Sequence, residues 1–223
     1  MTIYERAVDM ITDGTTIGLG SGRASEAFVR LVGERVRAGR LSVRGLPTSQ
    51  STAALARQNG IPLVTPAEAG TLDLAVDGAD EVDPHLDLIK GYGRAFVRER
   101  IVAGFARRFV ILVGEEKLVS QLGSRGKLPV EVVPYAIPLC ERRLRDLLCP
   151  ATPYRVNSEL FVSDNGNHIL DCAIGPIDDP ATPERDILAI PGVVDTGLFL
   201  DMANTVLVGD RSDFRLLEVR KRH

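Results

Sequence analysis

Hydrophobic positions in the first 125 residues alternate between the spacing of a helix and the short continuous runs of a buried strand. Ile3, Ala7, Met10 and Ile11 fall on one face of a helix that we expect to end at Gly14. The apolar stretch 72–76 is typical of a buried strand. The same reasoning predicts helices over 24–36, 49–60 and 95–107, and strands over 15–20, 41–47 and 109–114.

This strand–helix alternation predicts an α/β fold, with a mostly parallel, Rossmann-like sheet covered by helices on both faces. The pattern changes after residue 127, where prolines become frequent and Asn165-Gly166 indicates a hairpin. We therefore expect an α/β domain of residues 1–127 and 202–223, and a small α+β lobe of residues 128–201. Within these, helices are predicted over 138–149 and near 183–190, and strands over 192–200, 205–210 and 214–219.

Composition adds little to this picture but excludes several classes of protein. The 223 residues carry a net charge of −3, which gives no reason to expect a nucleic-acid or anionic-membrane partner. No apolar run approaches the roughly 20 residues that cross a bilayer. Cys140, Cys149 and Cys172 lack metal or redox spacing and are expected to be reduced thiols, so we expect a cytoplasmic protein without a resident metal or cofactor.

Glycines at 18, 20 and 22 occupy the end of the strand over 15–20 and the turn that leads to the helix over 24–36. Such a loop lets the backbone approach a ligand closely, and the N–H groups of the following helix favour an anion such as phosphate. Arg23 lies in the loop and would suit phosphate oxygens. The spacing fits neither a dinucleotide fingerprint nor a P-loop. A tight turn without any ligand is an equally good interpretation of this loop taken alone.

Five carboxylates follow the strand over 72–76, namely Asp77, Asp80, Glu81, Asp83 and Asp87, and Lys90 comes directly after them. Ligands of open α/β sheets bind beyond the carboxyl ends of the strands. A solvated acidic turn is the ordinary alternative. Carboxylates alone would suit Mg²⁺, but the lysine takes part of that charge, and no histidine pair or calcium-loop spacing is present. The set is better suited to metal-free proton transfer, with a carboxylate as base and an ammonium that stabilises an oxyanion.

The motifs of the chain resemble those of ribose-5-phosphate isomerase type A over nearly its whole length. The resemblance implies a sheet similar to those of sugar-phosphate isomerases and CoA transferases. It also implies metal-free interconversion of ribose 5-phosphate and ribulose 5-phosphate, in the pentose phosphate pathway, by a cytosolic homodimer or homotetramer. The motifs are "GLGSG", "PTSQST", "VDGADEVD", "LIKGYG", "RERIVA", "LPVEVVP", "DNGNHILD" and "IPGVVDTGLF".

The resemblance also assigns roles to residues. It implies that Glu99 is the base that moves a proton between C1 and C2, and that Asp77, Asp80 and Lys90 open the sugar ring and stabilise the enediolate. The implied substrate-binding residues are Ser21, Gly22, Arg23, Ala24, Gly78, Ala79, Gly91, Tyr92, Gly93 and Lys117.

The chain departs from the family pattern at three places. Arg23 and Ala24 replace two hydroxyl residues of the glycine loop, Tyr92 and Arg94 interrupt the glycine run after Lys90, and Gly114 stands where an aspartate is usual. We expect Arg23 to bind phosphate in place of the hydroxyls. The alternatives are an isomerase of another phosphorylated sugar, a non-catalytic sugar-phosphate sensor, a CoA transferase or acyltransferase-like enzyme, and an NAD-dependent enzyme.

Overall fold

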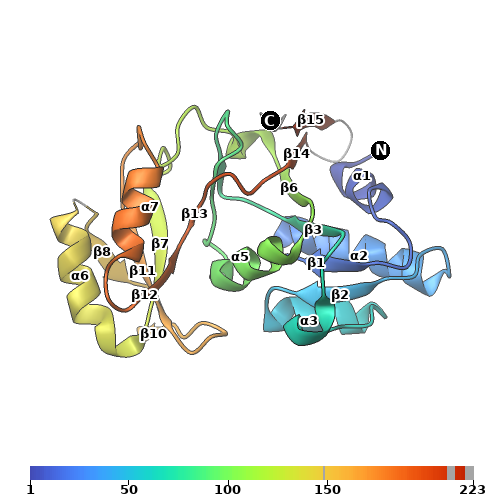
Figure 1. Ribbon diagram of the computed structural model, residues 1–223, viewed down its shortest axis with the longest axis horizontal. Coiled ribbons are helices and arrows are strands. Elements are labelled where there is room, and N and C mark those ends of the chain that lie inside the picture. Colours follow the sequence, from blue (N-terminus) through green and yellow to red (C-terminus); the bar gives the residue numbers. More distant parts are fainter. Residues whose placement is uncertain (148, 210–213, 219–223) are drawn as a thin grey trace. The chain divides into compact units, whose positions relative to one another are not determined.

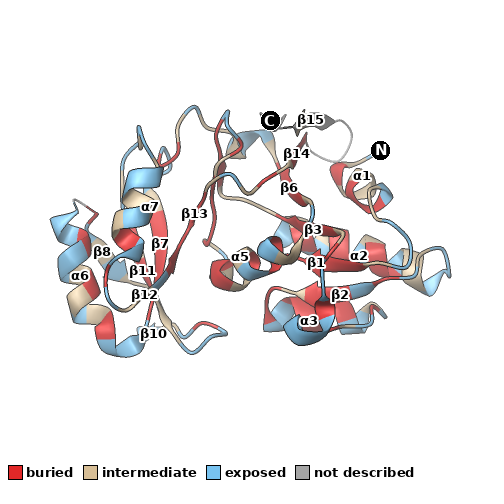
Figure 2. Ribbon diagram, in the orientation of Figure 1, coloured by how far each residue is buried: buried red, intermediate tan, exposed pale blue. Residues whose placement is uncertain are grey.

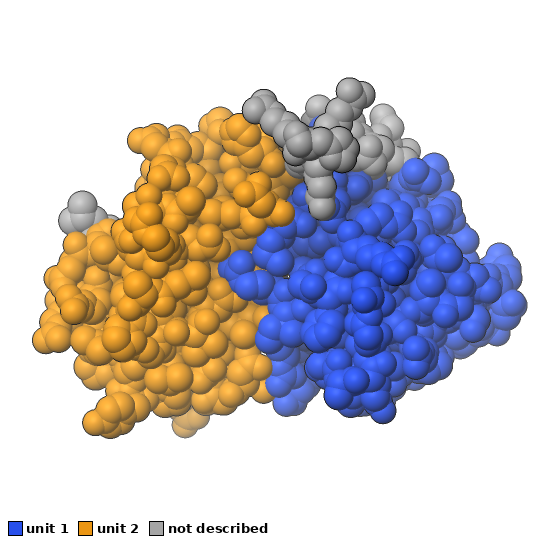
Figure 3. All heavy atoms as spheres, viewed as in Figure 1, with its two compact units in different colours: residues 1–79, 98–117, 202–223 blue, residues 80–97, 118–201 orange. Residues whose placement is uncertain are grey.

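The computed structural model describes residues 1–147, 149–209 and 214–218, which fall into two compact units. The first unit comprises Met1–Ala79, Arg98–Lys117 and the described residues from Met202 onward. The second comprises Asp80–Val97 and Leu118–Asp201 (Figure 3). The chain therefore leaves the first unit directly after the strand that carries Asp77, and returns to it just before Glu99.

The first unit is built on a sheet of six strands among the described residues (Figure 1). Neighbouring strands are parallel except β14 and β15, which pair antiparallel. The predicted mostly parallel sheet is confirmed. The strands, in sheet order, are β15 (Phe214–Glu218), β14 (Thr205–Gly209), β6 (Phe109–Val113), β3 (Leu74–Asp77), β1 (Thr16–Leu19) and β2 (Arg44–Pro47).

The first and third helices of this unit begin at residues with the expected capping chemistry. Thr2 and Glu5 form a reciprocal capping box at the first helix. Ser49 caps the third helix, because its side chain accepts the backbone N–H of Thr52. The elements are α1 (Ile3–Asp9), α2 (Arg23–Arg37), α3 (Gln50–Gln58), α4 (Pro66–Ala69), α5 (Phe96–Phe105) and the 3-10 helix η1 (Glu115–Lys117).

Helices cover both faces of this sheet, as predicted. On one face, Ile17 and Val76 of the strands pack into a core with Ile3 of α1 and Phe28 of α2. Figure 2 shows buried residues along these strands and on both helices. On the other face, Val102 of α5 approaches β1 so closely that a Cβ at Gly18 would lie 2.6 Å from its Cγ1. Glycine at this position therefore allows helix α5 to pack directly against the strand.

The second unit contains a four-stranded antiparallel sheet that packs against two helices. Leu128 and Leu170 of the sheet share a core with Cys140 and Leu144 of α6 and Ile187 of α7. The sheet order is β12 (Val193–Thr196), β7 (Lys127–Val132), β11 (His168–Ala173), β8 (Ala151–Pro153). The helices are α6 (Ile137–Asp146), α7 (Ala181–Leu188) and the 3-10 helix η2 (Pro134–Ala136). Two smaller sheets consist of β13 (Leu198–Phe199), β5 (Leu88–Ile89) and β4 (Glu81–Val82), and of β10 (Glu159–Leu160) and β9 (Arg155–Val156).

The turn at Asn165-Gly166 forms, but the prediction that it joins two paired strands is wrong. Strand β11 after the turn pairs with β7 and β8. The turn is held instead by the buried carboxylate of Glu131, whose Oε1 accepts hydrogen bonds from Ser163, Asn165 and Asn167 at 3.0, 3.0 and 2.9 Å. Hydrogen bonds to a carboxylate on a neighbouring strand thus hold this turn, where a hairpin would have backbone hydrogen bonds between two paired strands.

Several element ends differ from their predicted positions. Helix α1 ends at Asp9 instead of near Gly14, and the strand predicted over 41–47 begins only at Arg44. The intervening residues form polar turns, in which the N–H of Ser42 donates to Asp13 at 2.6 Å. Helix α6 ends at Asp146, and residues 148, 210 and 219 of the predicted elements lie outside the described residues. Within the described ranges, no helix is long and apolar enough to span a membrane.

Candidate active site

Asp77, at the carboxyl end of β3, holds the glycine loop in place. Its carboxylate is buried, and Oδ1 accepts the N–H of Ser21 at 3.1 Å, the N–H of Gly78 at 2.8 Å and the hydroxyl of Ser25 at 3.0 Å. The same neighbourhood contains Ala24, whose Cβ lies 3.9 Å from the position a Cβ would take at Gly78. The structure therefore brings together four predicted site residues of the first unit, Ser21, Ala24, Asp77 and Gly78, near the start of helix α2.

A cluster of hydroxyl groups lies beside this loop. The Ser21 hydroxyl is 2.7 Å from that of Thr48, 2.8 Å from that of Ser49 and 3.1 Å from that of Thr52. Thr48, Ser49 and Thr52 were missed as site residues by sequence reasoning, although the motif "PTSQST" follows directly from β2 at the same edge of the sheet. Such a group of hydroxyls and helix-terminal N–H groups is suited to an oxyanion.

Arg23 is the first residue of α2, which Gly22 precedes with a φ of +89°. Its side chain is exposed and makes no hydrogen bond or ion pair with any residue that the structure describes. The guanidinium is thus available to a ligand at the N-terminus of the helix.

Glu99 and Lys117 belong to the same edge of the parallel sheet. Glu99 lies in the first turn of α5 and is 5% exposed. Lys117 ends η1, just beyond the carboxyl end of β6, and is half-buried. The carboxylate of Glu116 lies against Gly114 and takes the space into which a side chain at position 114 would extend. Glutamate 116 therefore supplies a carboxylate at the place where the usual aspartate is missing.

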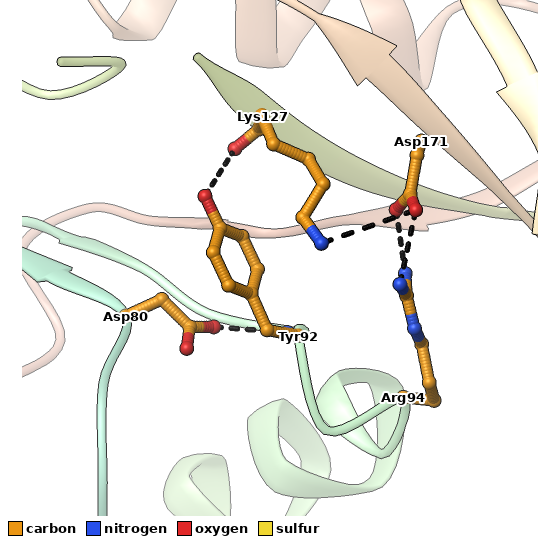
Figure 4. Close-up of polar contacts among 5 residues, drawn as sticks. All are labelled: Asp80, Tyr92, Arg94, Lys127 and Asp171. Carbon is orange, nitrogen blue, oxygen red and sulfur yellow. Dashed lines mark hydrogen bonds and ion pairs between the residues drawn. The ribbon is translucent and has the colours of Figure 1, made fainter. Parts of the chain in front are cut away.

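In the second unit, Lys90 is 3% exposed at the end of β5, and its backbone N–H donates to Gly197 O at 2.8 Å. Its ammonium lies 5.6 Å from the centre of the Phe199 ring. Asp80 accepts the N–H of Tyr92 at 2.9 Å through Oδ2, as Figure 4 shows. The structure thus brings Asp80 together with the loop that follows Lys90.

The other three carboxylates of the acidic run stabilise loops. Glu81 accepts the N–H groups of Gly123 and Arg125, at 2.6 and 2.8 Å. Asp83 accepts the N–H groups of His85 and Asp87. Burial raises the pKa of Asp87, although its carboxylate also accepts the N–H of Asp201 at 2.7 Å.

Among the residues described, no group of three or more His, Cys, Asp or Glu side chains is arranged to hold a metal ion.

The Tyr92 hydroxyl donates to Lys127 O at 3.1 Å, and its pKa is raised by burial and then by the Glu81 and Asp80 carboxylates. Because the pKa of Tyr92 is higher in the folded chain than in the unfolded chain, the folded state loses stability as pH rises above the unfolded value of about 10.

We expect Tyr92→Phe to lower the free energy of unfolding by about 1 kcal/mol near neutral pH. Its stability should also change less than that of wild type between about pH 9 and 11. Urea unfolding at each pH measures this, with the fully exposed Tyr135→Phe as control, and an unchanged alkaline dependence would contradict it.

Three comparisons place the chain among known proteins. The model of the family "Ribose 5-phosphate isomerase A (phosphoriboisomerase A)" matches residues 44–213. A ribose-5-phosphate isomerase A from Thermomicrobium roseum is 51% identical over 214 residues, covering 95% of this chain and 90% of the relative. The relative from Gloeobacter violaceus is 46% identical over 97% of this chain and 94% of its own length.

Solved structures agree with these matches. Ribose 5-phosphate isomerase A from Methanocaldococcus jannaschii superposes with a TM-score of 0.92 at 40% identity, covering 98% of this chain and 97% of that one. A D-ribose-5-phosphate isomerase solved in complex with phospho-erythronic acid superposes with a TM-score of 0.93 at 39% identity, covering 97% of this chain and 96% of that one.

Proposed function

The chain belongs to the ribose-5-phosphate isomerase A family, and from that premise we propose that it interconverts D-ribose 5-phosphate and D-ribulose 5-phosphate. The observation that carries the proposal is the 51% identity to a named isomerase over 95% of the chain. The reaction belongs to the non-oxidative pentose phosphate pathway. Incubating the purified protein with ribose 5-phosphate tests the proposal directly, because ribulose 5-phosphate must accumulate to equilibrium. The C2 epimer arabinose 5-phosphate is a matched comparison for the alternative that another sugar is preferred.

The reaction moves one proton between neighbouring carbons. In the open-chain aldose, a base removes the proton from C2, and the electron pair forms an enediolate with negative charge on the oxygens. Return of the proton to C1, together with transfer of the hydroxyl proton from O2 to O1, leaves a ketone at C2. We assign the base to Glu99, because the family resemblance gives this glutamate that role and its carboxylate, in the first turn of α5, can accept the C2 proton.

We assign to Lys90 the role of stabilising the negative charge of the enediolate. A buried ammonium that is fixed before the reaction stabilises negative charge far better than a solvated one. The Phe199 ring beside it supports this assignment, since an apolar neighbour keeps water away from the cation.

Ring opening requires proton transfer at the ring oxygen and at the C1 hydroxyl, and we assign it to Asp77 and Asp80. For Asp77 we add a second role. Its Oδ1 already accepts three hydrogen bonds from the glycine loop and its flanks, so this oxygen orients the loop for the phosphate.

In the second unit, we propose that the remaining contacts to the substrate come from Gly91 to Gly93, in the loop after Lys90.

Phosphate binding is the role proposed for Arg23, with support from Lys117. Arg23→Ala should raise KM for ribose 5-phosphate by well over about tenfold, because a charge-assisted contact to phosphate is lost, while kcat changes much less. Steady-state kinetics measures this. Arg30→Ala is the matched control, since Arg30 is an exposed arginine of the same helix α2. An Arg23→Ala variant with the KM of wild type would disprove the assignment.

We also propose that the protein works in the cytoplasm as a homodimer or homotetramer, without a nucleic-acid or membrane partner and without a cofactor. The family resemblance supports the oligomer. Exposed apolar side chains on the second unit offer surface for a second copy, notably Tyr135, which is 99% exposed, and Val133 and Val194. The buried free thiols of the three cysteines support a reducing compartment. Sedimentation velocity tests the assembly, and a monomer at micromolar concentration would contradict it.

A further inference from the structure

The loop from Lys90 to Arg94, here called the 90–94 loop, has little intrinsic rigidity. Gly91 has a φ of +107° and packs so closely on Phe96 that a Cβ there would lie 2.7 Å from its ring. Gly93 is a second glycine, with nothing within 4 Å of the position of a Cβ. A segment with two glycines has many alternative backbone conformations. Contacts from the other loop residues must therefore select the one observed.

Tyr92 supplies two of these contacts. Its backbone N–H donates to Asp80, and its hydroxyl donates to Lys127 O on β7 (Figure 4). The Lys127 ammonium lies 3.9 Å from the centre of the Tyr92 ring. Tyr92 is thus held both at its backbone N–H and at its hydroxyl, and the centre of the loop is attached to the four-stranded sheet through Lys127.

Arg94 supplies the third contact, and it is the strongest on geometric grounds. Both terminal nitrogens of its guanidinium donate to the Asp171 carboxylate on β11, at 2.5 and 3.0 Å. The two side chains are 9% and 22% exposed, and the guanidinium carbon lies 3.7 Å from the centre of the Tyr154 ring. A two-point arginine–carboxylate pair stacked on an aromatic ring fixes direction as well as distance.

The backbone of Arg94 indicates that this contact determines the loop conformation. Arg94 has a φ of +67°, a region that residues other than glycine occupy at a cost in free energy. Such a conformation persists only when its surroundings impose it. The ion pair with Asp171 is the contact that compensates for this cost, because it engages both ends of the guanidinium fork.

We propose that Arg94 is a positioning residue, whose ion pair with Asp171 sets the 90–94 loop and thereby the placement of the Lys90 ammonium. The inference rests on the proposed function, in which Lys90 stabilises the enediolate. Lys90 is the first residue of this loop and is held at its own N–H by Gly197. A loop that is fixed at Lys90, Tyr92 and Arg94 leaves its lysine little freedom to move away from a reacting oxygen. The side chain of Arg94 acts through this arrangement rather than on substrate, because Asp171 and Tyr154 already cover it.

The test uses two substitutions at position 94 in the full chain. Arg94→Gly and Arg94→Asn both remove the ion pair, and both residues tolerate a positive φ, but only glycine adds backbone freedom. Each should lower kcat by about tenfold to a hundredfold, since small displacements of a catalytic group have effects of this size. KM should rise less than kcat falls, because the proposed substrate contacts of Gly91 to Gly93 loosen with the loop, whereas the Lys90 contact is strongest in the transition state. Asp171→Ala should have the same effect, and the double variant Arg94→Asn/Asp171→Ala should lose no more than the worse single variant.

Hydrogen exchange supplies a readout that does not depend on turnover. Amides of residues 91–94 should exchange faster in the Arg94 and Asp171 variants than in wild type. Arg35→Ala is the matched control, because it breaks an exposed ion pair between Arg35 of α2 and Asp9 of α1 and should change neither loop exchange nor kcat. The proposal is overturned if loop exchange is unchanged, if exchange rises while kcat stays at the wild-type value, or if the effects of the Arg94 and Asp171 substitutions on kcat are additive. An inactive wild type would reject the proposed function, and loop exchange alone would then decide whether Arg94 orders the loop.

Discussion

Glu99→Gln lowers kcat for ribose 5-phosphate isomerisation by about 10²–10⁴-fold, the range in which a general base contributes. Glutamine has the shape of glutamate but accepts no proton, so the variant loses proton transfer while it keeps the packing of the first turn of α5. KM should remain within a few-fold, because the ground-state contacts to the sugar phosphate are unchanged. Steady-state kinetics in both directions measures the effect.

Glu26→Gln is the matched control for this result. Glu26 lies in the first turn of α2 as Glu99 lies in the first turn of α5, but it is exposed. The control should retain the kcat of wild type. If Glu99→Gln also retained it, the base would have to be another residue, and Asp77 and Asp80 would be the next candidates.

Lys90→Met has the second largest expected effect, a loss of about 10²–10³ in kcat, as is typical when one group that stabilises an oxyanion is removed. Methionine keeps an unbranched side chain of similar length beside Phe199, so packing around this 3%-exposed position is largely preserved. The enediolate then forms without its cation, which raises the barrier more than it weakens substrate binding.

Lys90→Arg separates charge from position. Arginine restores the positive charge but places it on a longer, planar group, so it should recover only part of the activity lost in Lys90→Met. Full activity of the methionine variant would show that no ammonium at this position is needed. The proposal that Arg94 positions Lys90 would fail with it, which links the two experiments.

The architecture of the main sheet could be predicted because it follows from local periodicity. Continuous apolar runs such as 109–113 and helical stripes such as Phe28 and Val32 identify buried strands and the helices that cover them. Element ends could not be predicted as well, because polar contacts in the turns beyond them, such as that between Ser42 and Asp13, join residues distant in sequence. The expected domain boundaries at 127/128 and 201/202 stay a prediction.

The candidate site was predictable where chemistry follows directly from a strand, as with Asp77, and unpredictable where it depends on distant partners. Sequence spacing does not distinguish Asp80, which contacts the loop after Lys90, from Glu81, which holds the loop at 123–125. Arg94 and Asp171 are 77 positions apart, and only the fold of the second unit brings them together. The hydroxyl cluster around Ser21 likewise joins two strands and a helix that are separate in sequence.

Two rival functions predict different outcomes from those described above. A non-catalytic sugar-phosphate-binding protein would bind ribose 5-phosphate without converting it. An enzyme similar to CoA transferases would form a covalent ester between a glutamate and CoA, which mass spectrometry would detect. Neither rival explains why the chain is 51% identical to a ribose-5-phosphate isomerase A over 95% of its length.

Proton NMR in D2O, with chelator-treated protein and ribose 5-phosphate, decides whether Glu99 transfers the proton without a metal. We expect wild type still to convert the aldose to ribulose 5-phosphate, with the C2 proton of the substrate transferred to C1 or exchanged for deuterium. Glu99→Gln should do neither, although it still binds the sugar phosphate. Conversion by Glu99→Gln at the wild-type rate, or wild-type activity that disappears on chelation and returns with a divalent metal, would contradict metal-free proton transfer by Glu99.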